Sequence, residues 1–223
     1  MFIEGRHGPE VDPDLASTLR SVSPATLGHF TDFGFTRGLR PNRTHLKVVG
    51  GAVTVRIPHL DATAVHCVMD VVRPGDVIVV DQSGDMDRAC WGGGMSYVAQ
   101  LKGAEGVIVD GAVTDVDEID DLGPPVFFRS VSALTTRLLG IEGAINVPGT
   151  VGGVTVCPGD VIFADENGVA VLTVPQAEHY APLLVEREAA GPEVRRRLSA
   201  GESLADISGA RKLFEANCQR AVT

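Results

Sequence analysis

Strand-like and helix-like patterns alternate through the middle of the chain. Residues 47–57 are mostly apolar around Gly50-Gly51, which predicts a strand with a bulge or a close backbone approach at the glycines. Residues 62–72 carry apolar side chains at helical spacing. Pro74-Gly75 then ends that helix and starts another strand. The pattern is typical of a protein in which helices cover a sheet.

A helix is also predicted near each end of the chain. Ser23-Pro24 has the form of a cap followed by proline at the first helical position, so we expect a short helix that ends near Gly34 or Gly38. From Gln176 onward the pattern becomes helical and charged, and Pro182 is predicted to kink or restart this last helix.

A hairpin is the strongest local signal in the second half. Asn167-Gly168 separates two apolar runs, residues 161–164 and 169–172, as in a two-residue hairpin turn. Strict alternation of strands and helices fails across residues 143–174, so a pure Rossmann or barrel topology fits poorly. The sequence therefore predicts an α/β layered domain whose sheets contain antiparallel as well as parallel pairs.

Composition narrows the class of protein. No linker-like stretch interrupts the 223 residues, which predicts a single domain with a core at about 24–175 and a helical arm at about 176–223. The formal net charge of -10 repels nucleic acid. No basic leader or membrane-length apolar run occurs, so we expect a soluble, cytoplasmic protein. The four cysteines lack CxxC spacing, which argues against a zinc site or a disulfide framework.

A small-molecule site is predicted between a glycine cluster and an acidic residue. Gly92-Gly93-Gly94 leads into a helix-periodic segment, residues 95–102, so unpaired backbone amides should face an anion there. The apolar run 107–109 predicts a buried strand that stops at Asp110-Gly111 and leaves Asp115 just past its end.

Acidic residues are frequent between positions 81 and 121, and oxygen ligands of this kind suit Mg²⁺ or Mn²⁺. Most of these carboxylates are explained as turn residues, caps or surface charges. Only Asp115, opposite the glycines, is singled out as a metal ligand.

Ordered motifs resemble a known family. They are Pro74-Gly75-Asp76-Val77-Ile78, Trp91-Gly92, Val109-Asp110-Gly111-Ala112-Val113-Thr114-Asp115, Asn146-Val147-Pro148, Val151-Gly152-Gly153 and Pro158-Gly159-Asp160. Together they resemble RNase E activity regulator A and the 4-hydroxy-4-methyl-2-oxoglutarate aldolases, over roughly residues 24–206. The resemblance implies a swivelling β/β/α fold and assembly into homotrimers or homohexamers.

The resemblance also implies roles for individual residues. Asp115 corresponds to the metal-binding Asp of the aldolase branch, and the backbone amides around Gly93, Gly94 and Met95 correspond to the groups that hold the substrate carboxylate. The chain departs from the aldolase pattern twice, because Thr114 replaces the arginine and Gly93 replaces the acid. Loss of one preorganised donor typically lowers turnover by about a hundredfold to a thousandfold.

Substitutes for the two lost groups are conceivable elsewhere in the chain. Arg88 lies in the loop before the glycines, together with Asp85 and Asp87, and Arg129 follows a later strand. A glutamate of the C-terminal arm, Glu186 or Glu188, could instead reach the site of a neighbouring subunit.

Three functions remain open at this point. The first is a divalent-metal-dependent lyase that cleaves or decarboxylates a small oxo acid, with Asp115 holding the metal and Thr114 contacting the substrate. The second is a non-catalytic regulator that acts on a ribonuclease by protein contact. The third is a biosynthetic enzyme that uses the pocket without metal.

Overall fold

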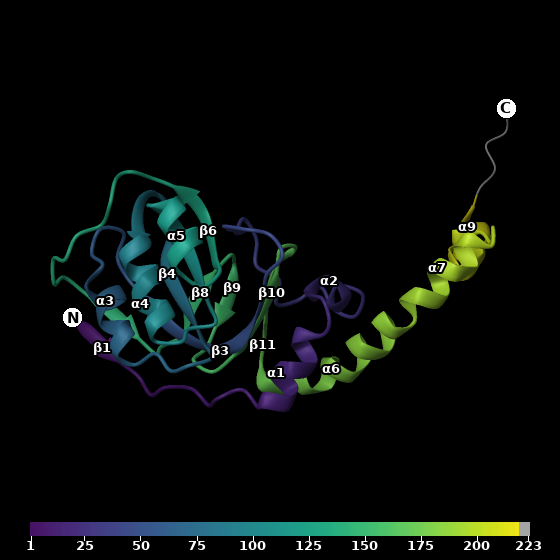
Figure 1. Cartoon of the computed structure of the whole chain (residues 1–223), viewed down its shortest axis with the longest axis horizontal. Coiled ribbons are helices and arrows are strands. Elements are labelled where there is room, and N and C mark those ends of the chain that lie inside the picture. Colours follow the sequence, from purple (N-terminus) through teal and green to yellow (C-terminus); the bar gives the residue numbers. More distant parts are fainter. Residues whose placement is uncertain (219–223) are drawn as a thin grey trace.

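A mixed sheet forms the centre of the computed structural model, which describes residues 1–218 (Figure 1). Seven strands follow the order β1-β7-β3-β4-β5-β6-β2, and β10 and β11 join through β3. Their bounds are β1 Phe2–Glu4, β2 Arg40–Pro41, β3 Lys47–Arg56, β4 Asp76–Trp91, β5 Gly106–Val113, β6 Val126–Val131, β7 Gly143–Ile145, β10 Val161–Asp165 and β11 Gly168–Leu172. A separate antiparallel pair contains β8 Gly149–Val151 and β9 Val154–Val156.

Helices surround this sheet and continue beyond it. Their bounds are α1 Pro13–Arg20, α2 Pro24–Leu27, α3 Thr63–Cys67 with the 3₁₀ turn η1 Val68–Asp70, α4 Gly93–Leu101, α5 Val116–Leu122, α6 Val174–Ala189, α7 Gly191–Ser199, α8 Leu204–Ser208 and α9 Ala210–Asn217. The sequence analysis did not predict α1 or α5. The mixed α/β fold with a mixed sheet is confirmed.

The parallel part of the sheet positions the site. β3, β4, β5 and β6 are successive parallel neighbours. Trp91 pairs with Val113, and Val113 pairs with Val131, so these three strands end at one edge. Segments that follow the carboxyl ends of parallel strands therefore meet there.

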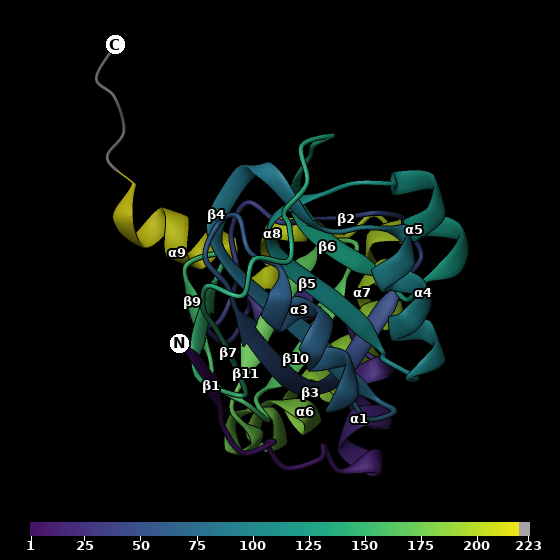
Figure 2. The ribbon, with the colours of Figure 1, turned by 90° about the vertical axis from the view of Figure 1, so that its left-hand side faces the viewer.

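Alternating side chains of β4 enter two separate clusters, one on each face of the sheet. Ile78 packs with α3, α4 and α5 residues on one face, and Val79 packs on the other with Val151 and Val156 of the β8–β9 pair. Figure 2 shows α3, α4 and α5 over the parallel strands. A period of two along a strand buried on both faces explains its nearly continuous apolar run.

A third cluster extends beyond both ends of the predicted core of residues 24–175. Leu19 of α1 and Leu184 of α6 pack with Phe163 of β10, and all three side chains are fully buried. The hydrophobic core therefore begins before residue 24 and extends into the helix that follows β11.

Several local predictions are confirmed. The predicted hairpin forms as β10–β11, although its two-residue turn is Glu166-Asn167 and Gly168 already pairs with Asp165. β3 begins at Lys47 as expected, and a side chain at Gly50 would overlap the carbonyl of Gly75, which is the predicted close backbone approach. The predicted helix 62–72 forms as α3 and η1.

Three predicted boundaries are wrong. β5 does not stop at Asp110-Gly111 but continues to Val113, because β4 bulges beside it and keeps the pairing. α2 ends at Leu27, since the chain must turn for Phe35 to pair with Ala170 of β11.

The third concerns the C-terminal helix. Pro182 lies inside α6 without ending it, and the new helix starts instead at Gly191 with Pro192 in its first turn.

The C-terminal arm departs from the sheet after α6 (Figure 1). Helices α7, α8 and α9 contain no buried residue. The last five positions of the predicted arm, 219–223, lie outside the described residues. Within residues 1–218 no helix combines the length and apolarity needed to cross a membrane.

Candidate functional site

A pocket of about 400 Å³ opens at the carboxyl edge of β4, β5 and β6. Four segments line it: α3 with the residue before it, the end of β4 with the start of α4, the β5–α5 junction, and the irregular segment 132–142 after β6. Its polar lining groups include Thr114, Asp115, Thr135, Thr136, Arg137 and His66. The pocket volume suits a small molecule rather than a polymer.

Asp115 faces the glycines, as the sequence predicts. It is the N-cap residue of α5 and adopts a left-handed backbone conformation, with φ of 53°. Its Oδ2 accepts a hydrogen bond from the Gly93 amide at 3.3 Å, and the Thr114 hydroxyl donates to Oδ1 at 3.2 Å. Two weak contacts fix the carboxylate while leaving its remaining lone pairs available at the pocket mouth.

A helix starts at the glycine cluster, as predicted, but the Gly93 amide differs from the prediction in what it contacts. Helix α4 begins at Gly93 and its N-cap is Gly92. The Gly93 amide points to Asp115 rather than to a ligand. The amides of Gly94 and Met95 have no intrahelical partner and make no other hydrogen bond among residues 1–218. These two amides are therefore free to donate to an anion at the pocket.

The space next to Gly93 is filled by a carboxylate from another element. A Cβ atom built on Gly93 would overlap the Glu118 side chain, and one built on Gly92 would lie 2.5 Å from Asp115 Oδ2. Glu118 is one turn after Asp115 on α5, so both carboxylates approach the same glycine turn. The acid that is missing at position 93 therefore has a counterpart that enters from α5.

A divalent cation fits this donor set as a sparsely liganded ion. Within residues 1–218 no group of three or more His, Cys, Asp or Glu side chains converges on one point. Mg²⁺ and Mn²⁺ accept one or two carboxylates and retain several waters, whereas structural zinc needs a closed set of four ligands. The glycine cradle that admits Asp115 and Glu118 is consistent with the first arrangement.

The segment 132–142 brings side chains that the sequence analysis did not select. Arg137 and Thr136 line the pocket from this segment, and His66 lines it from α3. An irregular segment has no hydrophobic periodicity from which its position could be predicted. Only the order of the strands could have placed it at the site, because the segment that follows a third parallel strand starts at the same edge of the sheet.

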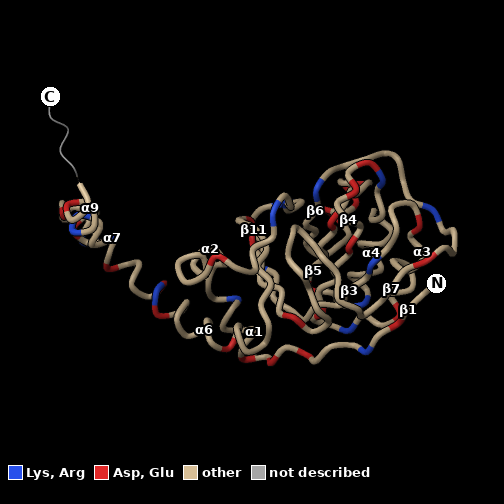
Figure 3. Tube along the Cα trace, turned by 180° about the vertical axis from the view of Figure 1, so that it is seen from behind, with Lys and Arg blue, Asp and Glu red and all other residues tan. Residues whose placement is uncertain are grey.

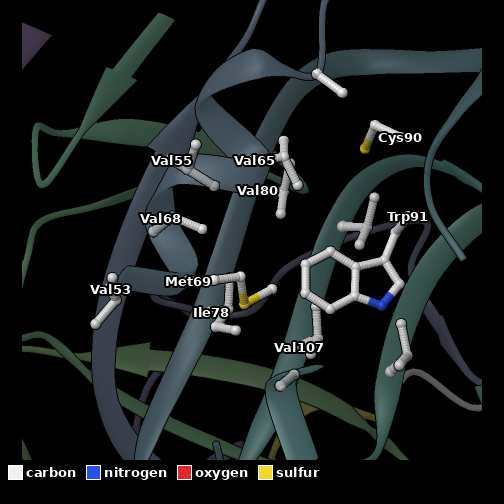
Figure 4. Close-up of a cluster of buried hydrophobic side chains, with 14 of the residues drawn as sticks. Val53, Val55, Val65, Val68, Met69, Ile78, Val80, Cys90, Trp91 and Val107 are labelled. Carbon is white, nitrogen blue, oxygen red and sulfur yellow. The ribbon is translucent and has the colours of Figure 1, made fainter. Parts of the chain in front are cut away.

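The pocket floor belongs to the hydrophobic core (Figure 4). Trp91 is buried and its indole Nε1 donates to the Ser96 hydroxyl at 2.8 Å, which ties the end of β4 to α4. Burial raises the pKa of the Cys90 thiol to about 12. Cys90 therefore remains protonated at neutral pH and is not a nucleophile.

None of the substitutes named from the sequence lines the pocket of its own chain. Arg129 Nε donates to Asp110 Oδ1 at 2.6 Å and forms an ion pair away from the pocket lining. Glu188 accepts hydrogen bonds from the Ser23 amide and the Thr26 hydroxyl of its own chain. Figure 3 shows basic positions interspersed with acidic ones along the chain.

The chain is similar in sequence to known proteins. The sequence model of the RraA-like family, described as Aldolase/RraA, matches residues 21–171. A relative from Halalkalibacterium halodurans, named "Putative 4-hydroxy-4-methyl-2-oxoglutarate aldolase", is 33% identical over 190 residues, which are 84% of this chain and 90% of the relative.

Two solved structures are similar in both sequence and fold. Streptomyces coelicolor RraAS2, described as an unusual member of the RNase ES inhibitor RraA protein family, is 28% identical with a TM-score of 0.76, covering 84% of this chain and 99% of its own. The RNA-processing inhibitor RraA from Thermus thermophilis is 26% identical with a TM-score of 0.60, covering 68% of this chain and 92% of its own. With the family model matched over most of its length, the chain belongs to the RraA-like (Aldolase/RraA) family.

Proposed function

We propose that this protein is a divalent-metal-dependent lyase that cleaves or decarboxylates a small 2-oxo acid. The observation that carries the proposal is the placement of the Asp115 carboxylate against the first turn of α4, in one pocket with the unpaired amides of Gly94 and Met95. A cation and an organic anion can share such a pocket.

Different residues of the pocket bind the substrate carboxylate and the metal ion. The two free amides of α4 hold the substrate carboxylate. Asp115, with Glu118 at the same glycine turn, would hold Mg²⁺ or Mn²⁺, which would supply Lewis-acid polarisation of the substrate carbonyl. The Thr114 hydroxyl orients Asp115 through its contact with Oδ1.

Carbon–carbon cleavage also requires proton transfer, and His66 is placed for it. In aldol cleavage the substrate hydroxyl loses its proton and becomes the carbonyl of one product, while the electrons of the broken carbon–carbon bond pass to the enolate of the 2-oxo product. Imidazole is the side chain best suited to exchange protons near neutral pH, and His66 lines the same pocket. In the decarboxylation of an oxo acid no such hydroxyl proton is lost, so only the enolate must be protonated afterwards.

Asp115→Asn tests the proposal. Pyruvate release from 4-hydroxy-4-methyl-2-oxoglutarate and from oxaloacetate is measured with Mg²⁺ or Mn²⁺. We expect the variant to lose turnover by roughly a hundredfold or more, because a neutral amide is a poor ligand for a hard cation. Asn also tolerates the left-handed backbone at this position, so the fold should persist.

Asp117→Asn is the matched control, since Asp117 is an exposed acid of the same helix that does not line the pocket. Full activity of the Asp115 variant, or equal losses in both variants, contradicts the metal role.

A regulatory function is the second candidate, and one observation favours it. Position 93 carries no acid, and two similar structures are described as inhibitors of RNA processing or of RNase ES. Pull-down of an RNase E-type enzyme by the pure protein, with no change of the melting temperature in Mg²⁺ or Mn²⁺ and no turnover, would establish this candidate over the lyase.

A further inference from the structure

We propose that the protein has a second small-molecule site, which binds a small alkylated ammonium ion between β9, β11 and the start of α6. The cavity there has a volume of about 180 Å³ and shares no lining residue with the pocket around Asp115. The side chains that carry the inference are Phe33, Asp160 and Tyr180, from three different segments of the chain. The proposed lyase reaction uses none of them, so this site can be tested separately from it.

Asp160 brings a negative charge to the cavity without a counter-charge. It is the one charged side chain among the lining residues, and it forms no ion pair within residues 1–218. Burial removes water from the carboxylate and raises its pKa above the ordinary value of 3.8, although the Cys157 amide donates to Oδ2 at 2.7 Å. A cation in the cavity is therefore attracted, and an anion is repelled.

Two aromatic rings line the same cavity. Phe33 is 81% exposed, so its ring is accessible to a ligand, and Tyr180 is half-buried on α6. Aromatic faces attract cations, and alkylated ammonium ions are the ligands for which such rings are best known. A hard metal ion would instead need several oxygen ligands, and no group of three or more His, Cys, Asp or Glu side chains converges within residues 1–218. One carboxylate with two rings therefore favours an organic cation.

Backbone hydrogen bonds hold the walls of the cavity in place. The Val171 amide of β11 donates to the Gly34 carbonyl at 2.8 Å, which fixes the loop after α2. The Asp160 carbonyl accepts from the Ala52 amide of β3 at 2.8 Å. The Thr173 side chain caps the start of α6. The cavity is therefore largely preformed, and a small ligand need not order these segments.

NMR titration of the isotope-labelled protein with choline tests the site without turnover. The reference probe is 3,3-dimethyl-1-butanol, which has the shape of choline with a carbon atom in place of the charged nitrogen. We expect choline to bind about tenfold more tightly or better, because only choline pairs with the carboxylate and the rings as a cation. The amide signals around Gly34 and Thr155 should shift.

Three variants locate the binding. Asp160→Asn should remove most of the advantage of choline, because the amide is uncharged while its oxygen can still accept from the Cys157 amide. Phe33→Leu keeps an apolar side chain but removes the ring, and it should weaken choline binding about two- to fivefold. Asp32→Asn removes the same charge from an exposed neighbour that does not line the cavity, and it should leave binding unchanged.

Equal affinities for choline and the alcohol, or no saturable choline binding, overturn the inference. So do losses in Asp32→Asn as large as those in Asp160→Asn, since they would reflect only the overall negative charge. Should Asp160→Asn fail to fold, the Phe33→Leu titration decides, and an unchanged affinity there overturns the inference. Pyruvate release depends on the pocket around Asp115 and is decided by its own assay.

Discussion

A side chain at position 93 would overlap the side chain of Glu118. Gly93 is in the first turn of α4, and the Glu118 side chain occupies the volume that any Cβ there would need. Alanine is normally favoured over glycine within a helix by about 1 kcal/mol. Here the overlap opposes that preference, and overpacking costs about 1–3 kcal/mol.

A double-mutant cycle measures this competition. We expect Gly93→Ala to lower the free energy of unfolding by about 1 kcal/mol in the wild-type background and to raise it in the Glu118→Gly background, because only glycine at position 118 removes the Cβ atom that lies 2.5 Å from the new one. Urea denaturation of the four proteins gives the coupling. Additive effects of the two substitutions would show that Glu118 moves aside without cost.

At the level of elements, the segment 132–142 depends on one buried carboxylate. Asp61 is 0% exposed and accepts hydrogen bonds from the Leu139 and Ile141 amides, as well as from the amide and hydroxyl of Thr63. Burial alone would raise the pKa of Asp61, but these hydrogen bonds outweigh it and hold the pKa well below its ordinary value of 3.8. The stabilisation is present above that ordinary value and is lost only as the pH falls through the lower folded value.

Asp61→Asn should loosen the wall of the pocket. An amide nitrogen placed at one carboxylate oxygen position cannot accept, so either the Ile141 amide or the donors from Thr63 and Leu139 lose a partner. We expect a loss of about 2 kcal/mol in unfolding free energy and faster amide exchange across 134–141, measured by hydrogen–deuterium exchange. Asp70→Asn, at an exposed position of η1, should leave that exchange unchanged. Equal protection in both variants would show that Asp61 does not anchor the segment.

Local signals explain which elements and site residues could be predicted. Neighbouring residues are enough to predict the hairpin around Asn167-Gly168 and the start of α4 at the glycines. The position of Asp115 could be predicted because it directly follows a strand. The continuation of β5 depends on a bulged neighbour more than twenty positions earlier in the chain, and no local pattern reports that pairing. Arg137 was missed for the same reason, since only the assembled sheet edge brings it to Asp115.

At the scale of the whole molecule, the C-terminal arm exposes apolar side chains and does not pack on the sheet. Leu213 and Phe214 of α9 are 71% and 70% exposed, and α7 to α9 bury no residue against the sheet. Helices this short are marginal in water without tertiary packing. We predict that the arm packs on another copy of the chain, in the homotrimer or homohexamer expected from the family resemblance.

Truncation after Ala190 tests the role of the arm. Light scattering after size exclusion should show a trimer or hexamer for the full chain and a lower mass for the truncated one. The melting temperature of a dilute sample should change little, because the buried clusters end at Leu184. A monomeric full chain, or an unchanged mass after truncation, contradicts the prediction.

The carboxylate that lies over Gly93 also constrains the order in which this sequence can evolve. An aspartate or glutamate cannot be placed at position 93 while Glu118 keeps its present volume, so the α5 side chain must shrink first. A single substitution to an acid at position 93 should therefore be selected against, even where the added carboxylate would be useful. The overlap thus fixes the order in which the two positions can change.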